Sequence, residues 1–94
     1  MSSQTSNGPA IWDLVVTKPA QKQLEKLPSR DKARVQAILR TMRENPFGGD
    51  ILRLRAEPSS WRRRVGNYRI FFDLYPERLL VVVTGVVRRT STTY

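Results

Sequence analysis

The stretch from Trp61 to Leu74 constrains the fold of this chain more than any other, because it is typical of two β-strands joined by a two-residue turn. Gly66-Asn67 separates the two strand-like runs, and glycine accepts the positive φ that the first position of a type II′ turn requires. A loop of only two residues leaves one register for the pairing. The sequence therefore predicts four cross-strand pairs: Val65 with Tyr68, Arg64 with Arg69, Arg63 with Ile70, and Arg62 with Phe71.

This register places three arginines on one side of the predicted sheet. Side chains alternate between the two faces of a strand, so Arg62, Arg64 and Arg69 share a face. Arg63 falls on the opposite, apolar face, and we expect it at a sheet edge with its guanidinium in water. Three guanidinium groups in a small area repel one another, which a fold tolerates more readily where an anion binds. The hairpin therefore predicts an anion-binding patch.

The apolar run from Leu79 to Val87 predicts one more strand, after a four-residue turn made by residues 75–78. With that turn length Arg69 pairs with Thr84, and Arg88 joins Arg69 on the same face. The register also pairs Leu74 with Leu79; it continues the arginine side through Leu80, Val82, Thr84 and Val86, and it gives the core side Val65, Tyr68, Ile70, Phe72, Leu74, Val81, Val83 and Val87.

Two helices are predicted between a first strand over residues 11–16 and the hairpin. Thr17 is the expected N-cap of the first helix, with Pro19 in the first turn, where no N–H is needed. Ser29 is the expected cap of the second helix, which runs to about Glu44. Apolar residues recur at helical spacing in both helices: Ala20, Leu24 and Leu27, then Val35, Ile38, Leu39 and Met42.

These elements predict an α+β fold in the order β-α-α-β-β-β, with an N-terminal helical hairpin packed on one face of an antiparallel sheet. Residues 51–55 are either a short strand or an extended lead-in. Residues 1–9 are small and polar, so we expect a disordered tail and no signal peptide. Residues 10–94 are expected to form one domain, and no apolar run is long enough to span a membrane.

The composition excludes several kinds of site. The chain has no cysteine and no histidine, which excludes disulfides, thiolate sites, Ser-His triads and histidine-based ribonuclease chemistry, and which fits a reducing compartment such as the cytoplasm. The net charge of +9 favours a polyanionic partner, with nucleic acid first. Residues 51–94 have nine arginines and no lysine, which favours bidentate contacts to phosphate.

The order of elements and several motifs resemble the RelE branch of the RelE/ParE toxin superfamily. The motifs are Leu52-Arg-Leu54, the Trp-Arg-x-Arg run at 61–64, Gly66-Asn-Tyr-Arg-Ile70, and a valine-rich last strand that leads into Arg88-Arg89, with a tyrosine six residues after Arg88. The resemblance covers about residues 11–94. It implies a fold similar to that of small microbial ribonucleases.

The resemblance implies the toxin of a type II toxin-antitoxin system, a metal-independent and cofactor-free mRNA endonuclease that acts in the A site of the 30S subunit in the cytoplasm. The implied partners are a cognate antitoxin, the ribosome and mRNA, with no membrane partner. By match to the family motifs, the catalytic residues are Arg62, Arg64, Arg69, Arg88 and Tyr94. The neighbouring basic residues predicted to bind RNA are Arg53, Arg55, Arg63, Arg89, Lys32 and Arg34, for the last two of which a solvated helix face is the alternative.

RNA supplies its own nucleophile, the 2′-hydroxyl, so cleavage to a 2′,3′-cyclic phosphate and a 5′-hydroxyl needs mainly orientation and charge stabilisation. Arg69 and Arg62 are assigned to the scissile phosphate, Arg64 to the 2′-hydroxyl, and Arg88 to the leaving oxygen. Tyr94 is assigned to base stacking or proton transfer. Asp73 shares the arginine side and is expected to pair with an arginine.

One position departs from the family pattern. Relatives with lysine at the position of Arg64 use it as a proton acceptor, whereas arginine stays charged and is not expected to act as a neutral base. Two alternatives to the endonuclease remain open: a ParE-type gyrase inhibitor, and a non-catalytic module that binds RNA or the ribosome.

Overall fold

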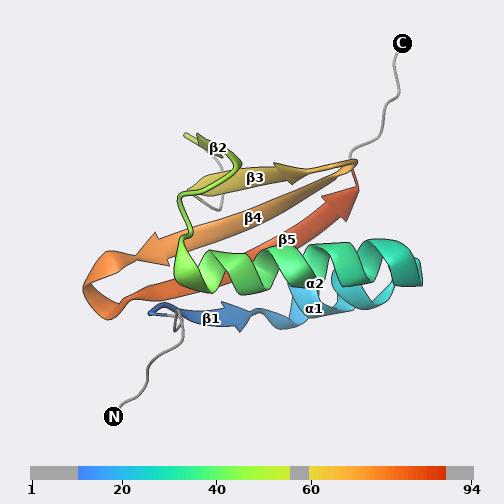
Figure 1. Cartoon of the computed structure of the whole chain (residues 1–94), viewed down its shortest axis with the longest axis horizontal. Helices are drawn as coiled ribbons and strands as arrows, with labels where there is room; N and C mark the ends of the chain where they lie inside the picture. Colours follow the sequence, from blue (N-terminus) through green and yellow to red (C-terminus); the bar gives the residue numbers. More distant parts are fainter. Residues whose placement is uncertain (1–10, 56–59, 89–94) are drawn as a thin grey trace.

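The computed structural model describes residues 11–55 and 60–88 (Figure 1). It has the α+β fold that the sequence predicts, but the element order is β-α-α-β-β-β-β, one strand more than predicted, because residues 50–53 form a strand rather than a lead-in. The elements are β1 (Asp13–Val16), α1 (Lys18–Glu25), α2 (Ser29–Glu44), β2 (Asp50–Arg53), β3 (Trp61–Val65), β4 (Tyr68–Tyr75), a 3₁₀ turn (Pro76–Arg78) and β5 (Leu80–Arg88).

The strands form one sheet in the order β1-β5-β4-β3-β2. β1 runs parallel to β5, and the other neighbouring pairs are antiparallel. Figure 1 shows β1 and β2 at opposite borders of the sheet, with α2 lying over one of its faces. No helix in the described part of the chain is long and apolar enough to cross a membrane.

The helix boundaries follow the local sequence signals. The side chain of Thr17 accepts a hydrogen bond from the N–H of Ala20 at 3.4 Å, as predicted for an N-cap. The prediction of Ser29 as the second cap is wrong by one residue, because Pro28 has the extended backbone of the cap position and Ser29 is already helical. α2 ends at Glu44, as expected.

The hairpin register is confirmed at all four predicted pairs. Gly66 has a φ of 58°, and Leu79 is the only described residue other than glycine with a positive φ. Asn67 therefore has a negative φ, and this combination of signs is that of a type II′ turn. The turn chemistry that the sequence signals is thus the one that sets the register of β3 against β4.

The predicted register between β4 and β5 is wrong. The loop consists of residues 76–79, not 75–78, because the chain makes a 3₁₀ turn and then a left-handed Leu79, so Leu74 pairs with Val81. Further along, Phe72 pairs with Val83 but Phe71 pairs with Gly85, which leaves one extra residue in β5 and forms a β-bulge. Arg69 consequently pairs with Val87 instead of Thr84.

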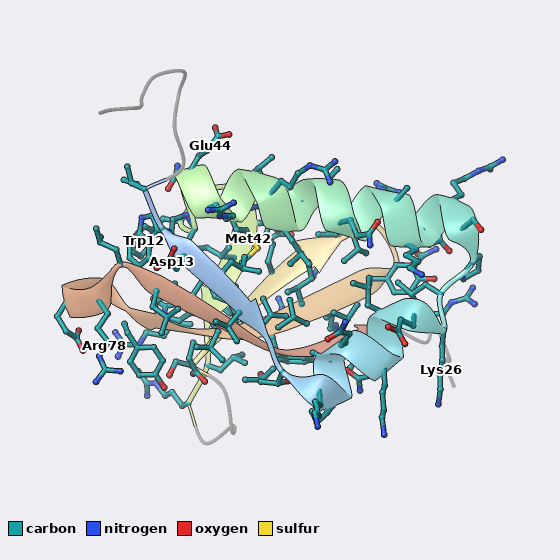
Figure 2. The ribbon with its side chains drawn as sticks, turned by 90° about the horizontal axis from the view of Figure 1, so that it is seen from below. Trp12, Asp13, Lys26, Met42, Glu44 and Arg78 are labelled. Carbon is teal, nitrogen blue, oxygen red and sulfur yellow. The ribbon has the colours of Figure 1, made fainter. Side chains whose placement is uncertain are left out.

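The bulge exchanges the two faces of β5 beyond residue 84. Val86, expected on the arginine side, is 2% exposed in the core, whereas Val87, expected in the core, is 41% exposed. Before the bulge the predicted faces hold, since Val81 and Val83 are fully buried. The remaining core lies between α1, α2 and the sheet, where Met42 projects from α2 toward the strands (Figure 2): Trp12, Ala20, Leu24, Val35, Leu39, Met42, Val65, Tyr68, Ile70 and Phe72.

Candidate functional site

Three arginines form a compact group on the sheet face that no described helix covers. We call Arg62, Arg64 and Arg69 the arginine cluster. Arg64 is the direct cross-strand partner of Arg69, while Arg62 is the partner of Phe71 and thus a diagonal neighbour of Arg69. Direct partners on one face have Cβ atoms about 4.5–5.5 Å apart, and diagonal neighbours are about 7–8 Å apart. The predicted grouping of these three residues is confirmed.

Two members of the arginine cluster have unmet hydrogen-bonding capacity. The Nε atoms of Arg62 and Arg69 are buried and have no hydrogen-bond partner. Both side chains are half-buried at neighbouring positions of the sheet, so their charges are partly removed from water. Like charges in such surroundings repel each other strongly, and a bound anion relieves the repulsion. The arrangement therefore favours occupation of this face by a phosphate or a similar anion.

A carboxylate borders the arginine cluster, and the sequence analysis did not identify it. Asp50 in β2 is the cross-strand partner of Arg64, and its Oδ2 lies 3.6 Å from Arg64 Nε. The side chains are 59% and 42% exposed, so the pair is a weak one that an incoming anion can displace. The signal that places Asp50 here is the register of β2 against β3, which the hairpin alone does not determine.

Arg88 is not part of the arginine cluster, contrary to the prediction. Its cross-strand partner is Tyr68, which is 5% exposed and packs on the helix-covered face. The hydroxyl of Tyr68 donates a 2.7 Å hydrogen bond to Asp31 of α2. This bond and burial raise the pKa of Tyr68, while the positive charge of Arg88 acts in the opposite direction. Arg88 was predicted on the wrong face because the bulge adds one residue to β5, so the side chains after Thr84 point to the face opposite to the predicted one.

Two other expectations on the hairpin are also wrong. Asp73 accepts a 2.7 Å hydrogen bond from the backbone N–H of Ser60, and no ion pair joins it to an arginine in the described part of the chain. Arg63 does lie on the face of Ile70, as predicted, but not at a sheet edge, because β2 pairs with β3 on its outer side. Burial lowers the pKa of Arg63. Its guanidinium lies so close to Gly49 that a Cβ there would be 2.5 Å from it.

The other described basic residues that were predicted to bind RNA do not belong to the arginine cluster. Arg53 and Arg55 are exposed on and after β2, and Arg34 is exposed on α2 with its guanidinium beside the hairpin turn at Gly66. Lys32 is half-buried on α2. Arg89 and Tyr94 lie outside the described residues.

The arginine cluster suits a phosphate that gains charge during a reaction. Guanidinium groups offer paired N–H donors in a fixed plane. Three long side chains that leave one sheet face at neighbouring positions can together contact several oxygens of one phosphate. Arginine does not act as a neutral base, so a proton acceptor has to come from elsewhere. Among the described carboxylates, Asp50 is the candidate proton acceptor, because it lies beside Arg64.

In the comparison with known proteins, the matching family model and the similar solved structures are both of toxins from toxin-antitoxin systems. The model of the "ParE toxin of type II toxin-antitoxin system, parDE" matches residues 14–91. The toxin-antitoxin complex RelBE2 of Mycobacterium tuberculosis is similar at 28% identity, with a TM-score of 0.74 over 83% of this chain and 98% of that one. Comparison with the curated proteins gives no significant match.

Two further solved structures share the fold at lower identity. The RelE-RelB complex of Pyrococcus horikoshii OT3 has 17% identity and a TM-score of 0.76, covering 87% of this chain and 99% of that one. The isolated E. coli RelE toxin has 21% identity and a TM-score of 0.71, covering 86% and 87%.

Proposed function

The chain belongs to the ParE toxin family of type II toxin-antitoxin systems, within the RelE/ParE superfamily, and we propose that it is a ribosome-dependent mRNA endonuclease. The single observation that supports this most is the arginine cluster on an open sheet face, with Asp50 beside it. A polyanion with an internal nucleophile is the substrate that such a site suits, and RNA is that polyanion.

The proposed reaction forms a bond between the 2′-oxygen and the adjacent phosphorus and breaks the bond from phosphorus to the 5′-oxygen. Arg62 and Arg69 hold the phosphate oxygens and stabilise the charge that develops on them. Arg64 lies nearest the 2′-hydroxyl, and the carboxylate of Asp50 beside it takes the proton. The products are a 2′,3′-cyclic phosphate and a 5′-hydroxyl, and the reaction needs no metal or cofactor.

The leaving 5′-oxygen must receive a proton, and Arg88 does not supply it, since Arg88 lies on the other face of the sheet. We assign Tyr94 to this step; if Tyr94 instead stacks on a base of the substrate, a water molecule donates the proton. Arg89 and the exposed Arg53 and Arg55 contact the RNA on either side of the cut. Arg34 and Lys32 contact RNA from the helix side.

A cognate antitoxin is the proposed protein partner. The proposal is supported by two of the matched structures, which are complexes of RelE-type toxins with RelB-type antitoxins. The ribosomal A site on the 30S subunit and the mRNA in it are the proposed cytoplasmic targets. They would orient the RNA against the arginine cluster.

A gyrase inhibitor is the second candidate function, because the matching family model is that of a ParE toxin. The arginine cluster has no evident use in that role. Primer extension on translated mRNA after induction separates the candidates. Discrete cuts that disappear in Arg69→Ala support the endonuclease, whereas intact mRNA with a DNA-damage response supports the gyrase inhibitor. Salt-dependent RNA binding without a cut supports a non-catalytic module.

A further inference from the structure

We propose that this chain has a separate pocket for one unpaired RNA base, located beyond β2 and built on the guanidinium of Arg53. The proposal rests on the proposed action on RNA and adds a site that gives it a base preference. A pocket of about 440 Å³ is lined by Arg53, Leu54 and Arg55. That volume lies within the range of small-molecule sites and accommodates a nucleobase with its ribose.

The position of Arg53 is set by a column of aromatic rings. The Cζ atom of Arg53 lies 5.8 Å from the centroid of the Trp61 ring. Trp61 in turn stacks on the fully buried Phe72 at 6.4 Å between centroids and 18° between planes. Phe47 meets the edge of Trp61 at 6.1 Å. Because the ring beneath it is fixed by the core, the guanidinium loses little freedom when a ligand stacks on it.

The lining of the pocket suits a nucleotide. A guanidinium held over a tryptophan ring can stack on a base with its other side and also donate hydrogen bonds to base oxygens and nitrogens. Arg55, two residues further, adds a positive charge for the attached phosphate. Leu54 is half-buried and supplies apolar contact. The described lining residues, Arg53, Leu54 and Arg55, include two cations and no acidic group.

The pocket lies close to the arginine cluster along the chain. Arg62 pairs with Leu52, and the next pair along the same ladder is Trp61 with Arg53. Arg53 and Arg62 point to opposite faces, but β2 is the edge strand of the sheet. A single RNA strand that leaves the arginine cluster can therefore pass around β2 and place a neighbouring base on Arg53. The identity of that base would then influence where the message is cut.

The test compares two uncleavable RNA pentamers with 2′-O-methyl groups, one with five bases and one fully abasic, so that their charge is the same. The full chain should bind the pentamer with bases at least about tenfold more tightly, because stacking on aromatic or guanidinium planes gives such a gain. Arg53→Lys keeps the charge but removes the planar group, so the difference should fall several-fold. Dissociation constants are measured by fluorescence anisotropy, with circular dichroism to verify the fold.

Arg30→Lys is the matched control, because Arg30 is an exposed arginine in the first turn of α2, next to the Asp31 that bonds the far end of the hairpin. It should leave the difference between the pentamers unchanged. The proposed pocket is refuted if Arg53→Lys retains the full difference in affinity between the two pentamers. It is also refuted if the unchanged chain binds both pentamers equally well. Since the pentamers cannot be cut, absence of mRNA cleavage in cells would count against the proposed reaction alone, and a base preference that depends on Arg53 would still support the pocket.

Discussion

Arg88 is the cross-strand partner of Tyr68, so its side chain leaves β5 on the face opposite to Arg69. The two arginines are near each other along the sheet but separated by its thickness. A site that uses both would require the RNA to reach both faces at the end of the hairpin. The geometry instead divides the basic residues into the arginine cluster on the open face and a second group, Arg34 and Arg88, around the hairpin turn on the helix side.

This division predicts unequal effects of two alanine substitutions. Arg69→Ala removes a donor to the phosphate and should lower the rate of mRNA cleavage about 100-fold or more. Arg88→Ala should lower it less than about tenfold, since its side chain lies away from that phosphate. The rates are measured by primer extension in a reconstituted translation system, with thermal unfolding as the control for stability. Equal losses would mean that both residues contact the reacting group.

Asp50→Asn should move catalysis and binding in opposite directions. Loss of the proton acceptor should lower the cleavage rate by about 100-fold or more. Loss of a negative charge 3.6 Å from Arg64 Nε should at the same time tighten binding of an uncleavable RNA. The control is Asp13→Asn, an exposed aspartate on the same sheet face but at the opposite border. An unchanged cleavage rate in Asp50→Asn would remove Asp50 from the mechanism.

Gly66→Ala should destabilise the fold by about 1–2 kcal/mol, because an L-residue is strained at a φ of 58°. A Cβ at this position would also lie 2.9 Å from Arg34 Nη1, at the flexible end of that side chain. The double variant Gly66→Ala/Arg34→Ala separates the two causes. If backbone strain dominates, removing Arg34 restores little stability in urea unfolding; a nearly full recovery would point to the steric contact.

The bond from Tyr68 to Asp31 predicts a loss of stability at alkaline pH. The pKa of Tyr68 is raised above its ordinary value of 10.0, first by this bond and then by burial, so the folded state holds the proton more tightly than the unfolded state. The contribution is complete below pH 10 and is lost as the pH rises through the raised pKa. Unfolding midpoints between pH 8 and about 12 should decline more in the unchanged chain than in Tyr68→Phe.

The matched control for that measurement is Tyr75→Phe, since Tyr75 is 41% exposed at the end of β4. It should retain the alkaline decline of the unchanged chain. A decline of the same size in Tyr68→Phe would assign the alkaline loss to other groups.

Local sequence determined the parts of this protein that depend on short-range chemistry. Thr17, Pro19 and the apolar stripes define the helices, and Gly66 defines the turn that brings Arg62, Arg64 and Arg69 together. In these cases the decisive interactions join residues close in the chain, so the local sequence pattern is sufficient to predict the helices and the turn. The expectations for residues 1–9, Arg89 and Tyr94 lie outside the described residues.

Only the tertiary structure decided how β5 and β2 meet the hairpin. The run from Val81 to Val87 is apolar on both of its sides, so alternation gives no preferred face, and the bulge at Thr84 depends on how β5 packs against α1 and β4. The place of Asp50 beside Arg64 depends likewise on pairing across a loop whose length does not determine the register. A strand's face follows from its own sequence only when polar and apolar residues alternate; where they do not, packing against the rest of the chain decides it.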